Sequence, residues 1–167
     1  MGYMSFVIRE PAAEEAALLA ELHVATWQEA YTHLLPAGFF DAEHVTSRHR
    51  MWNQILNDPA PTVTVRVAEH GGQLAGFALA GPSSADGGEK PGRHTHLYAI
   101  YVSAAHHGTG VGQALLDSAL GTAPATLWVA KQNPRAIAFY LRNGFAFDGM
   151  EKVDPMAPAI TEARMVR

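Results

Sequence analysis

Three glycines at alternate positions follow a run of aromatic and branched residues, and this arrangement suits the binding of an anion. The run ends at Val102, and the glycines stand at Gly108, Gly110 and Gly112. Glycines let backbone N–H groups approach a ligand closely. The unpaired N–H groups of a first helical turn, with the positive end of the helix dipole, favour phosphate. The stretch therefore predicts a strand, a loop and a helix that bind a phosphate group.

A second helix start lies further along the chain, at Asn133-Pro134. Asparagine is a good N-cap and proline suits the first helical position. Gly144, followed by Phe145, is expected to end this helix in the left-handed conformation. The residues expected to share its apolar face are Ile137, Tyr140 and Leu141. The helix after the glycines carries its apolar face on Val111, Leu115 and Ala119.

The rest of the chain alternates between strand and helix patterns. Strands are expected over about 4–9, 63–67, 74–80, 97–102, 126–129, 145–153 and 160–166. A first helix is expected to reach Trp27 to Tyr31 and a second to run from about Ala42 to Leu56. The first helix should bury Leu18, Leu22 and Ala25. Gly71-Gly72 predicts a hairpin turn, and Pro82 to Gly92 predicts a flexible loop.

Composition limits the class of protein. The chain has 167 residues, 48% of them hydrophobic, which predicts one α/β domain over residues 1–167. A net charge of -4, without a basic cluster, argues against a nucleic-acid partner. No apolar run is long enough for a membrane span, so a soluble, cytoplasmic protein is expected. Zero cysteines exclude disulfides, a thiol nucleophile and cysteine-ligated metals. The histidines form no pattern for a metal site.

Two linked motifs resemble the GCN5-related N-acetyltransferase (GNAT) family. The glycine stretch is similar to the family's Q/R-x-x-G-x-G/A signature and reads His107, Gly108, Thr109, Gly110, Val111, Gly112. His107 stands where the family usually has Gln or Arg. Asn133 to Phe145 is similar to the family's N-x-x-A-x-x-x-Y-x-x-x-G-F helix. The resemblance implies a GNAT fold: a mixed, twisted sheet of about seven strands, helices on both faces, and a splayed central strand pair. Because members of the family are often dimers, the resemblance is also compatible with a homodimer.

The resemblance implies an acetyl-CoA site. Backbone N–H groups from His107 to Gly112 would hold the pyrophosphate, and because these are main-chain contacts, His107 should weaken binding only modestly. Val102 would pair with the pantetheine arm as an added strand does, and the Ile100 N–H would meet the thioester carbonyl. Asn133 would contact coenzyme A, and Tyr140 would lie against the sulfur.

Acetyl transfer to an amine needs a base for the amine and an acid for the departing thiolate. His96 lies where one branch of the family carries its base, and Glu29 and His94 are reserve candidates. Tyr140 is the candidate acid. Each has a structural alternative: His96 as a polar surface residue at a strand end, Glu29 as a solvated side chain or a selector of cationic substrates, and Tyr140 as a core tyrosine.

The predicted function is acetyl-CoA-dependent N-acetylation of a primary amine by direct attack in a ternary complex, because no cysteine can form an acyl-enzyme. One alternative is a catalytically silent acetyl-CoA-binding or sensory module. Another is protein N-terminal or lysine acetylation, which needs an open groove. The sequence does not decide which amine is the acceptor: small amines, aminoglycosides, polyamines, amino acids and peptides all remain candidates.

Overall fold

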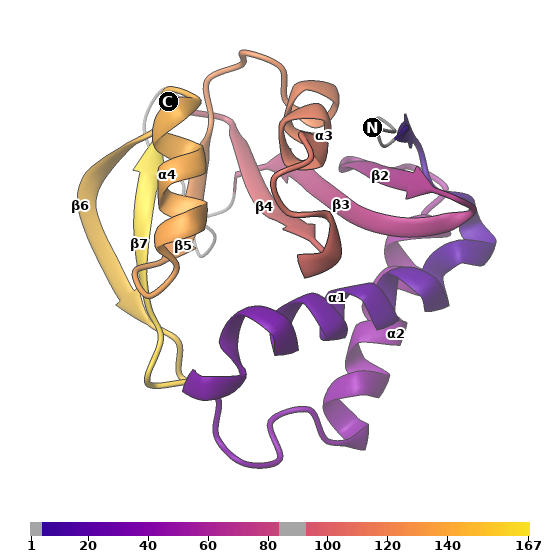
Figure 1. Cartoon of the computed structure of the whole chain (residues 1–167), viewed down its shortest axis with the longest axis horizontal. Coiled ribbons are helices and arrows are strands. Elements are labelled where there is room, and N and C mark those ends of the chain that lie inside the picture. The colour runs from indigo at the N-terminus through magenta and orange to yellow at the C-terminus, as the bar shows by residue number, and fades with distance from the viewer. Residues whose placement is uncertain (1–4, 84–92) are drawn as a thin grey trace.

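The computed structural model describes residues 5–83 and 93–167, and its described strands form one sheet (Figure 1). The strands are β1 (Val7–Arg9), β2 (Thr64–His70), β3 (Gln73–Pro82), β4 (Thr95–Val102), β5 (Thr126–Ala130), β6 (Ala146–Val153) and β7 (Thr161–Val166). Their order is β1-β2-β3-β4-β5-β7-β6, and the β4–β5 pair is parallel while the other pairs are antiparallel. This confirms the predicted mixed sheet of seven strands. Most of the loop expected at Pro82 to Gly92 lies outside the described residues.

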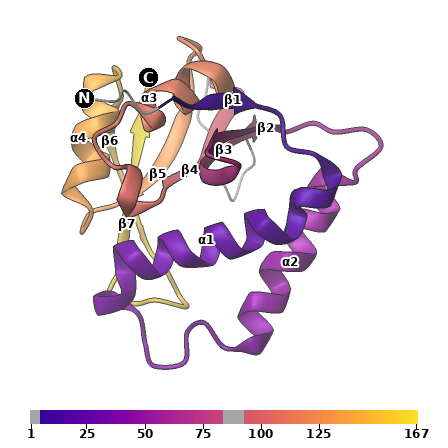
Figure 2. The ribbon, with the colours of Figure 1, turned by 45° about the vertical axis from the view of Figure 1, so that its right-hand side comes forward.

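The α-helices of the described residues cover the sheet, and they are α1 (Ala16–Tyr31), α2 (Ala42–Leu56), α3 (Val111–Ala119) and α4 (Pro134–Arg142). Figure 2 shows α1 and α2 together below the strands, whereas Figure 1 shows α3 and α4 in front of them. Val67 and Phe77 pack with α1 and α2, while Ala68 and Ala78 pack with α3. Because neighbouring strand residues point to opposite faces, the helices cover both faces, as predicted.

The buried face of α1 differs from the prediction. Leu22 packs on the core as predicted, but Leu18 is 51% exposed and Ala25 is exposed, and the helix buries a stripe that includes Leu19 and His23. His23 lies among aromatic rings and its Nδ1 accepts a hydrogen bond from Trp52 Nε1 at 3.3 Å. A pattern that counts histidine as polar misplaces this face. On α4, Ile137 packs on the core as predicted, but Leu141 is exposed.

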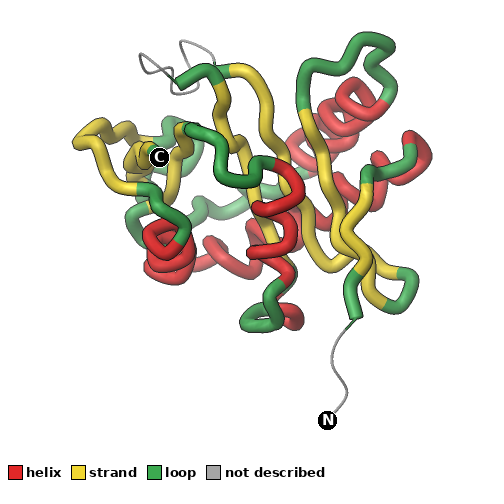
Figure 3. Tube along the Cα trace, turned by 90° about the horizontal axis from the view of Figure 1, so that it is seen from above, coloured by secondary structure: helices red, strands yellow, loops and turns green. Residues whose placement is uncertain are grey.

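The sheet opens at its centre. β4 and β5 pair at only two positions, His96 with Thr126 and Leu97 with Leu127. On the other side of β4, the register with β3 shifts so that Tyr98 becomes an extra, bulged residue. From Ala99 onward β4 continues beside β3 alone, which confirms the predicted splayed pair (Figure 3 shows the two parts of the sheet from above).

In the described ranges, no helix combines the length and the apolar character that a membrane span requires.

Candidate active site

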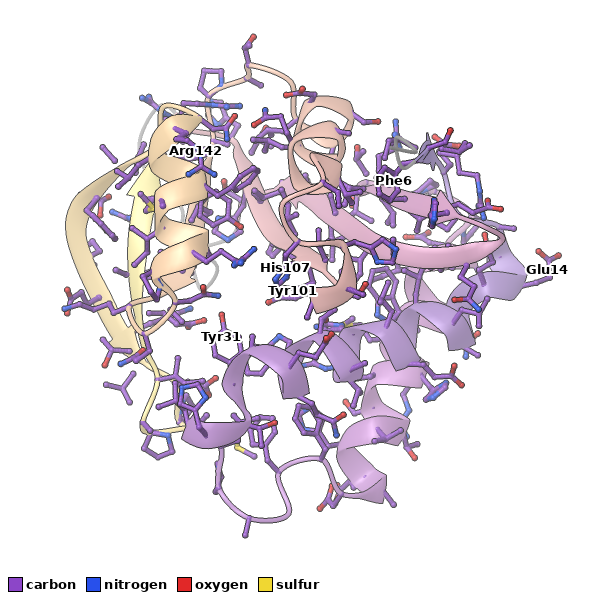
Figure 4. The ribbon with its side chains drawn as sticks, in the orientation of Figure 1. Phe6, Glu14, Tyr31, Tyr101, His107 and Arg142 are labelled. Atoms are coloured by element: carbon purple, nitrogen blue, oxygen red, sulfur yellow. The ribbon has the colours of Figure 1, made fainter. Side chains whose placement is uncertain are left out.

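A cavity of about 470 Å³ lies among the end of β4, the start of α3, α4 and the last turns of α1. Ile100 and Val102 line it from β4, past the end of the pairing with β5. Asn133 and Tyr140 line it from α4. His107, labelled near the centre of Figure 4, lines it from the loop before α3. The fold thus brings residues of both sequence motifs to one cavity.

Two glycines shape the loop at the cavity. Gly108 and Gly110 have φ angles of +76° and +89°, a region that other residues rarely adopt, and a Cβ on either would meet no atom within 4 Å. Gly110 is the N-cap of α3 and offers no capping side chain, so none occupies the N–H groups of the first turn. Gly112 has ordinary backbone, and its Cβ would lie 3.8 Å from the Phe139 ring. The loop therefore offers N–H groups and space to an anion.

Side chains of this loop bond to the protein's own backbone. His107 Nε2 donates to the Val102 carbonyl at 3.0 Å, which ties the loop to the end of β4. Thr109 Oγ1 donates to the His106 carbonyl at 2.5 Å, and Thr109 does not line the cavity. The His107 ring, at the position that departs from the family signature, therefore supports the shape of the loop.

Asn133 connects two sides of the cavity. Its Oδ1 accepts a hydrogen bond from the Ala136 N–H at 3.1 Å, which confirms the predicted N-cap of α4. Its Nδ2 donates to Tyr31 Oη at 3.1 Å, at the end of α1. The start of α4 is thereby fixed to α1 across the opening of the sheet.

A second cavity, of about 70 Å³, borders the first. The residues that line both cavities are Tyr31, Ile100, Tyr101, Asn133, Ala136 and Tyr140. Further walls of the smaller cavity come from Trp27, the bulged Tyr98, Trp128 and Glu162. Two compartments therefore meet where β4 and β5 separate, and Tyr140 and Ile100 belong to both.

Tyr140 is buried, with 8% of its surface exposed. Burial raises the pKa of its phenol well above the usual range, because a phenolate is poorly solvated there, and nearby Tyr101 adds to the shift. The hydroxyl is therefore protonated at any physiological pH and is able to donate a proton or a hydrogen bond.

His96 lines neither cavity and is 3% exposed. Its Nδ1 forms a hydrogen bond of 2.7 Å with Thr126 Oγ1, and its ring packs on Tyr98. Burial lowers its pKa to about 4, with smaller contributions from the charges of Lys152 and Arg164. His96 is therefore not among the residues that line a cavity with Tyr140, and it is not the surface residue of the alternative either, because it is buried and bonded to Thr126.

The two reserve candidates for the base, Glu29 and His94, lie in different parts of the structure. Glu29 lines the larger cavity, and its Oε2 accepts a hydrogen bond from the Ala104 N–H at 3.1 Å. It therefore joins α1 to the turn that follows β4. His94 is exposed and lines neither cavity, and its carbonyl accepts from the Ser83 N–H at 2.9 Å.

Some lining residues were not predicted from the sequence. Arg135 and Arg142 add two cations to the larger cavity from α4. They are seven residues apart inside the second motif, which places them on one helix face. This spacing was a signal in the sequence that could have predicted both cations. Tyr98 and Glu162 had no local signal, because only the bulge and the pairing of β5 with β7 place them at the smaller cavity.

Among the described residues, no group of three or more histidine, aspartate or glutamate side chains is arranged to hold a metal ion.

Comparisons with known proteins agree with this geometry. The model of the acetyltransferase (GNAT) family matches residues 12–145. The uncharacterized N-acetyltransferase YuaI of Bacillus subtilis is 29% identical over 139 residues, covering 80% of this chain and 76% of that protein. The peptidyl-lysine N-acetyltransferase YjaB of Escherichia coli is 37% identical over 62 residues, covering 36% of this chain and 42% of that protein.

Solved structures show the same fold. The PaiA N-acetyltransferase of Thermoplasma acidophilum, solved in complex with coenzyme A, superposes with a TM-score of 0.67 at 21% identity and covers 96% of this chain and 98% of its own. The residues that match the family model include all those that line the larger cavity, from α1 to α4. The chain therefore belongs to the GNAT family and is an N-acetyltransferase whose cosubstrate is acetyl-CoA.

Proposed function

We propose that this protein transfers the acetyl group of acetyl-CoA to a primary amine, by direct attack of the amine in a ternary complex. The observation that carries the proposal is the meeting of two cavities at Tyr140 and Ile100. Such an arrangement lets two substrates be held at once, with their reacting atoms close together.

The residues of the larger cavity fit acetyl-CoA. The space beside Gly108 and Gly110, where a Cβ is absent, and the free N–H groups at the start of α3 suit a pyrophosphate. Arg135 and Arg142 add positive charge to the same cavity. Ile100 and Val102 stand on the part of β4 that has no β5 partner, where an extended amide chain can lie. When bound, acetyl-CoA supplies an acetyl group activated as a thioester.

Tyr140 is proposed to give a proton to the departing sulfur. Its position in both cavities and its protonated state support this role. The Ile100 N–H is proposed to stabilise the negative charge that develops on the acetyl oxygen. The absence of cysteine from the whole chain leaves no thiol for an acyl-enzyme, which supports direct attack.

A lysine side chain is a second candidate acceptor. The relative YjaB is named a peptidyl-lysine N-acetyltransferase, and its similarity to this chain extends over 62 residues. A silent acetyl-CoA-binding module is the contrasting case, and it would bind the cosubstrate without acetylating any amine.

The test is an amine panel scored by release of free thiol from acetyl-CoA, with acetyl-CoA binding measured separately by calorimetry. We expect both binding and thiol release with at least one primary amine. Binding without release from any amine would leave the silent module as the better description.

A further inference from the structure

Glu162 is the single carboxylate among the described residues that line the smaller cavity. It stands on β7 opposite Ala130 of β5, so its side chain lies on the same face of the sheet as Ala130 and Trp128. Its side chain is only 26% exposed. A carboxylate buried to this degree is costly unless a positive charge accompanies it.

Lys152 is the cation beside Glu162, and it compensates the negative charge only in part. Lys152 Nζ lies 3.7 Å from Glu162 Oε2, near the limit of an ion pair, and the lysine side chain is 43% exposed. Burial raises the pKa of Glu162, and Asp154 raises it further, while Lys152 lowers it. Tyr31 and Tyr101 are the titratable groups that face the carboxylate from α1 and β4. Glu162 therefore retains capacity to bind a second cation.

Two cations of the described residues lie beside the Trp128 ring: the Arg164 guanidinium, 6.0 Å from the ring centre, and, closer to it, the Lys152 side chain. Its ammonium lies 4.4 Å from the centre of the Trp128 ring as well as beside Glu162. An aromatic face next to a carboxylate is a favourable site for an alkylammonium group. Trp27 and Tyr98 add two more aromatic walls to the cavity. The chain's own lysine is thus an internal example of a primary ammonium on an unbranched stem at Trp128 and Glu162.

The size of the cavity restricts the acceptor further. A volume of about 70 Å³ holds only a few water-sized groups. A terminal ammonium with its first methylene groups fits such a space more readily than an amino sugar or an amine on a branched carbon.

We propose that Glu162 recognises the acceptor as the terminal ammonium of an unbranched alkyl chain and takes a proton from it. This inference rests on the proposed function. Glu162 accepts one proton from the ammonium and releases it to water. The nitrogen bonds to the acetyl carbon as the acetyl–sulfur bond breaks, and Tyr140 gives a proton to the sulfur and regains one from the nitrogen. The products are an amide, a thiol and one proton.

The variant Glu162→Gln tests this assignment, because it keeps the volume and removes the charge. The matched control is Glu151→Gln, which removes an exposed carboxylate on β6 that pairs with Lys131 instead. For propylamine, cadaverine and Nα-acetyl-lysine amide, Glu162→Gln should lower kcat/KM about a hundredfold. The acidic limb of the pH profile of kcat/KM should also disappear. Acetyl-CoA affinity should not change, and Glu151→Gln should match the unaltered protein.

A measurement without turnover separates recognition from chemistry. Propylamine is titrated by calorimetry into the protein saturated with coenzyme A. We expect Glu162→Gln to bind the amine at least tenfold more weakly than the unaltered protein and Glu151→Gln. Equal amine affinity and equal kcat/KM in Glu162→Gln would overturn the inference while leaving the proposed function standing.

Comparing several amines as acceptors gives further tests of the inference. A preference for glucosamine or for an α-amine such as alaninamide over propylamine would also overturn the inference. Amine binding that depends on Glu162, without thiol release from any amine, would support recognition and contradict the proposed function. Nα-acetyl-lysine amide working better than cadaverine would identify the source of the ammonium as a lysine side chain, and the reverse order would identify a free diamine.

Discussion

Tyr140 shows how much the surroundings of one residue decide its chemistry. Its position in the second motif matched the family pattern, and the structure adds that it borders both cavities. Its burial keeps the resting side chain protonated at neutral pH, so Tyr140 is not the group that first takes a proton from the ammonium. What remains is proton donation, or a purely structural role in the core formed with Phe145.

The variant Tyr140→Phe separates these two roles, because it removes only the hydroxyl. We expect kcat to fall about a hundredfold and acetyl-CoA affinity to change less than twofold. Steady-state kinetics and calorimetry on the same preparation measure the two quantities. A kcat equal to that of the unaltered protein would assign Tyr140 to packing alone.

At the scale of the element, we expect acetyl-CoA binding to need both the backbone shape of the glycine loop and the open space beside it. Gly110→Val should weaken acetyl-CoA binding at least tenfold, because a side chain would enter the space beside the loop and the positive φ disfavours a β-branched residue. Calorimetry measures the affinity.

The control for Gly110→Val is Gly121→Val, just beyond the other end of α3, where φ is +60° and the site is away from both cavities. It also places a β-branched residue at positive φ, and it should lower the melting temperature without changing acetyl-CoA affinity. Equal affinity losses in the two variants would mean that strain, and not the occupied space, causes the effect.

Elements with local signals were predictable from the sequence, and elements that depend on distant pairing were not. The bounds of α2 and the Asn133 cap follow from neighbouring residues, and the structure confirms both. The predicted α1 face was wrong at Leu18 and Ala25, because the face depends on His23 packing against Trp52, 29 positions away. Glu162 reaches the smaller cavity through the β5–β7 pairing, which no local pattern encodes.

At the scale of the whole molecule, two buried histidines link stability to pH. Burial lowers the pKa of His23 to about 3 and that of His96 to about 4. Both are neutral in the folded state, whereas in the unfolded chain they gain protons below about 6.5. Since the unfolded state then binds more protons, stability is full above this pH and falls as the pH drops toward 4.

We expect the free energy of unfolding to decrease by several kcal/mol, on the order of 3 per histidine, between pH 7 and pH 4. Urea denaturation at several pH values measures this slope. His96→Gln should be less stable at pH 7, because the Thr126 hydrogen bond is lost, but should show a shallower slope. An unchanged slope in this variant would contradict the assignment of a buried, neutral His96.

The two-position contact between β4 and β5 has a consequence for the lifetime of the protein. A sheet joined so briefly at its centre is a favoured place for partial opening, which exposes backbone to proteases. Acetyl-CoA in the larger cavity would contact both sides of this seam, and a ligand at a hundred times its Kd stabilises a folded state by about 2.7 kcal/mol. The rate at which the protein is degraded should therefore depend on the supply of acetyl-CoA, so that the enzyme persists longest when its acetyl donor is abundant.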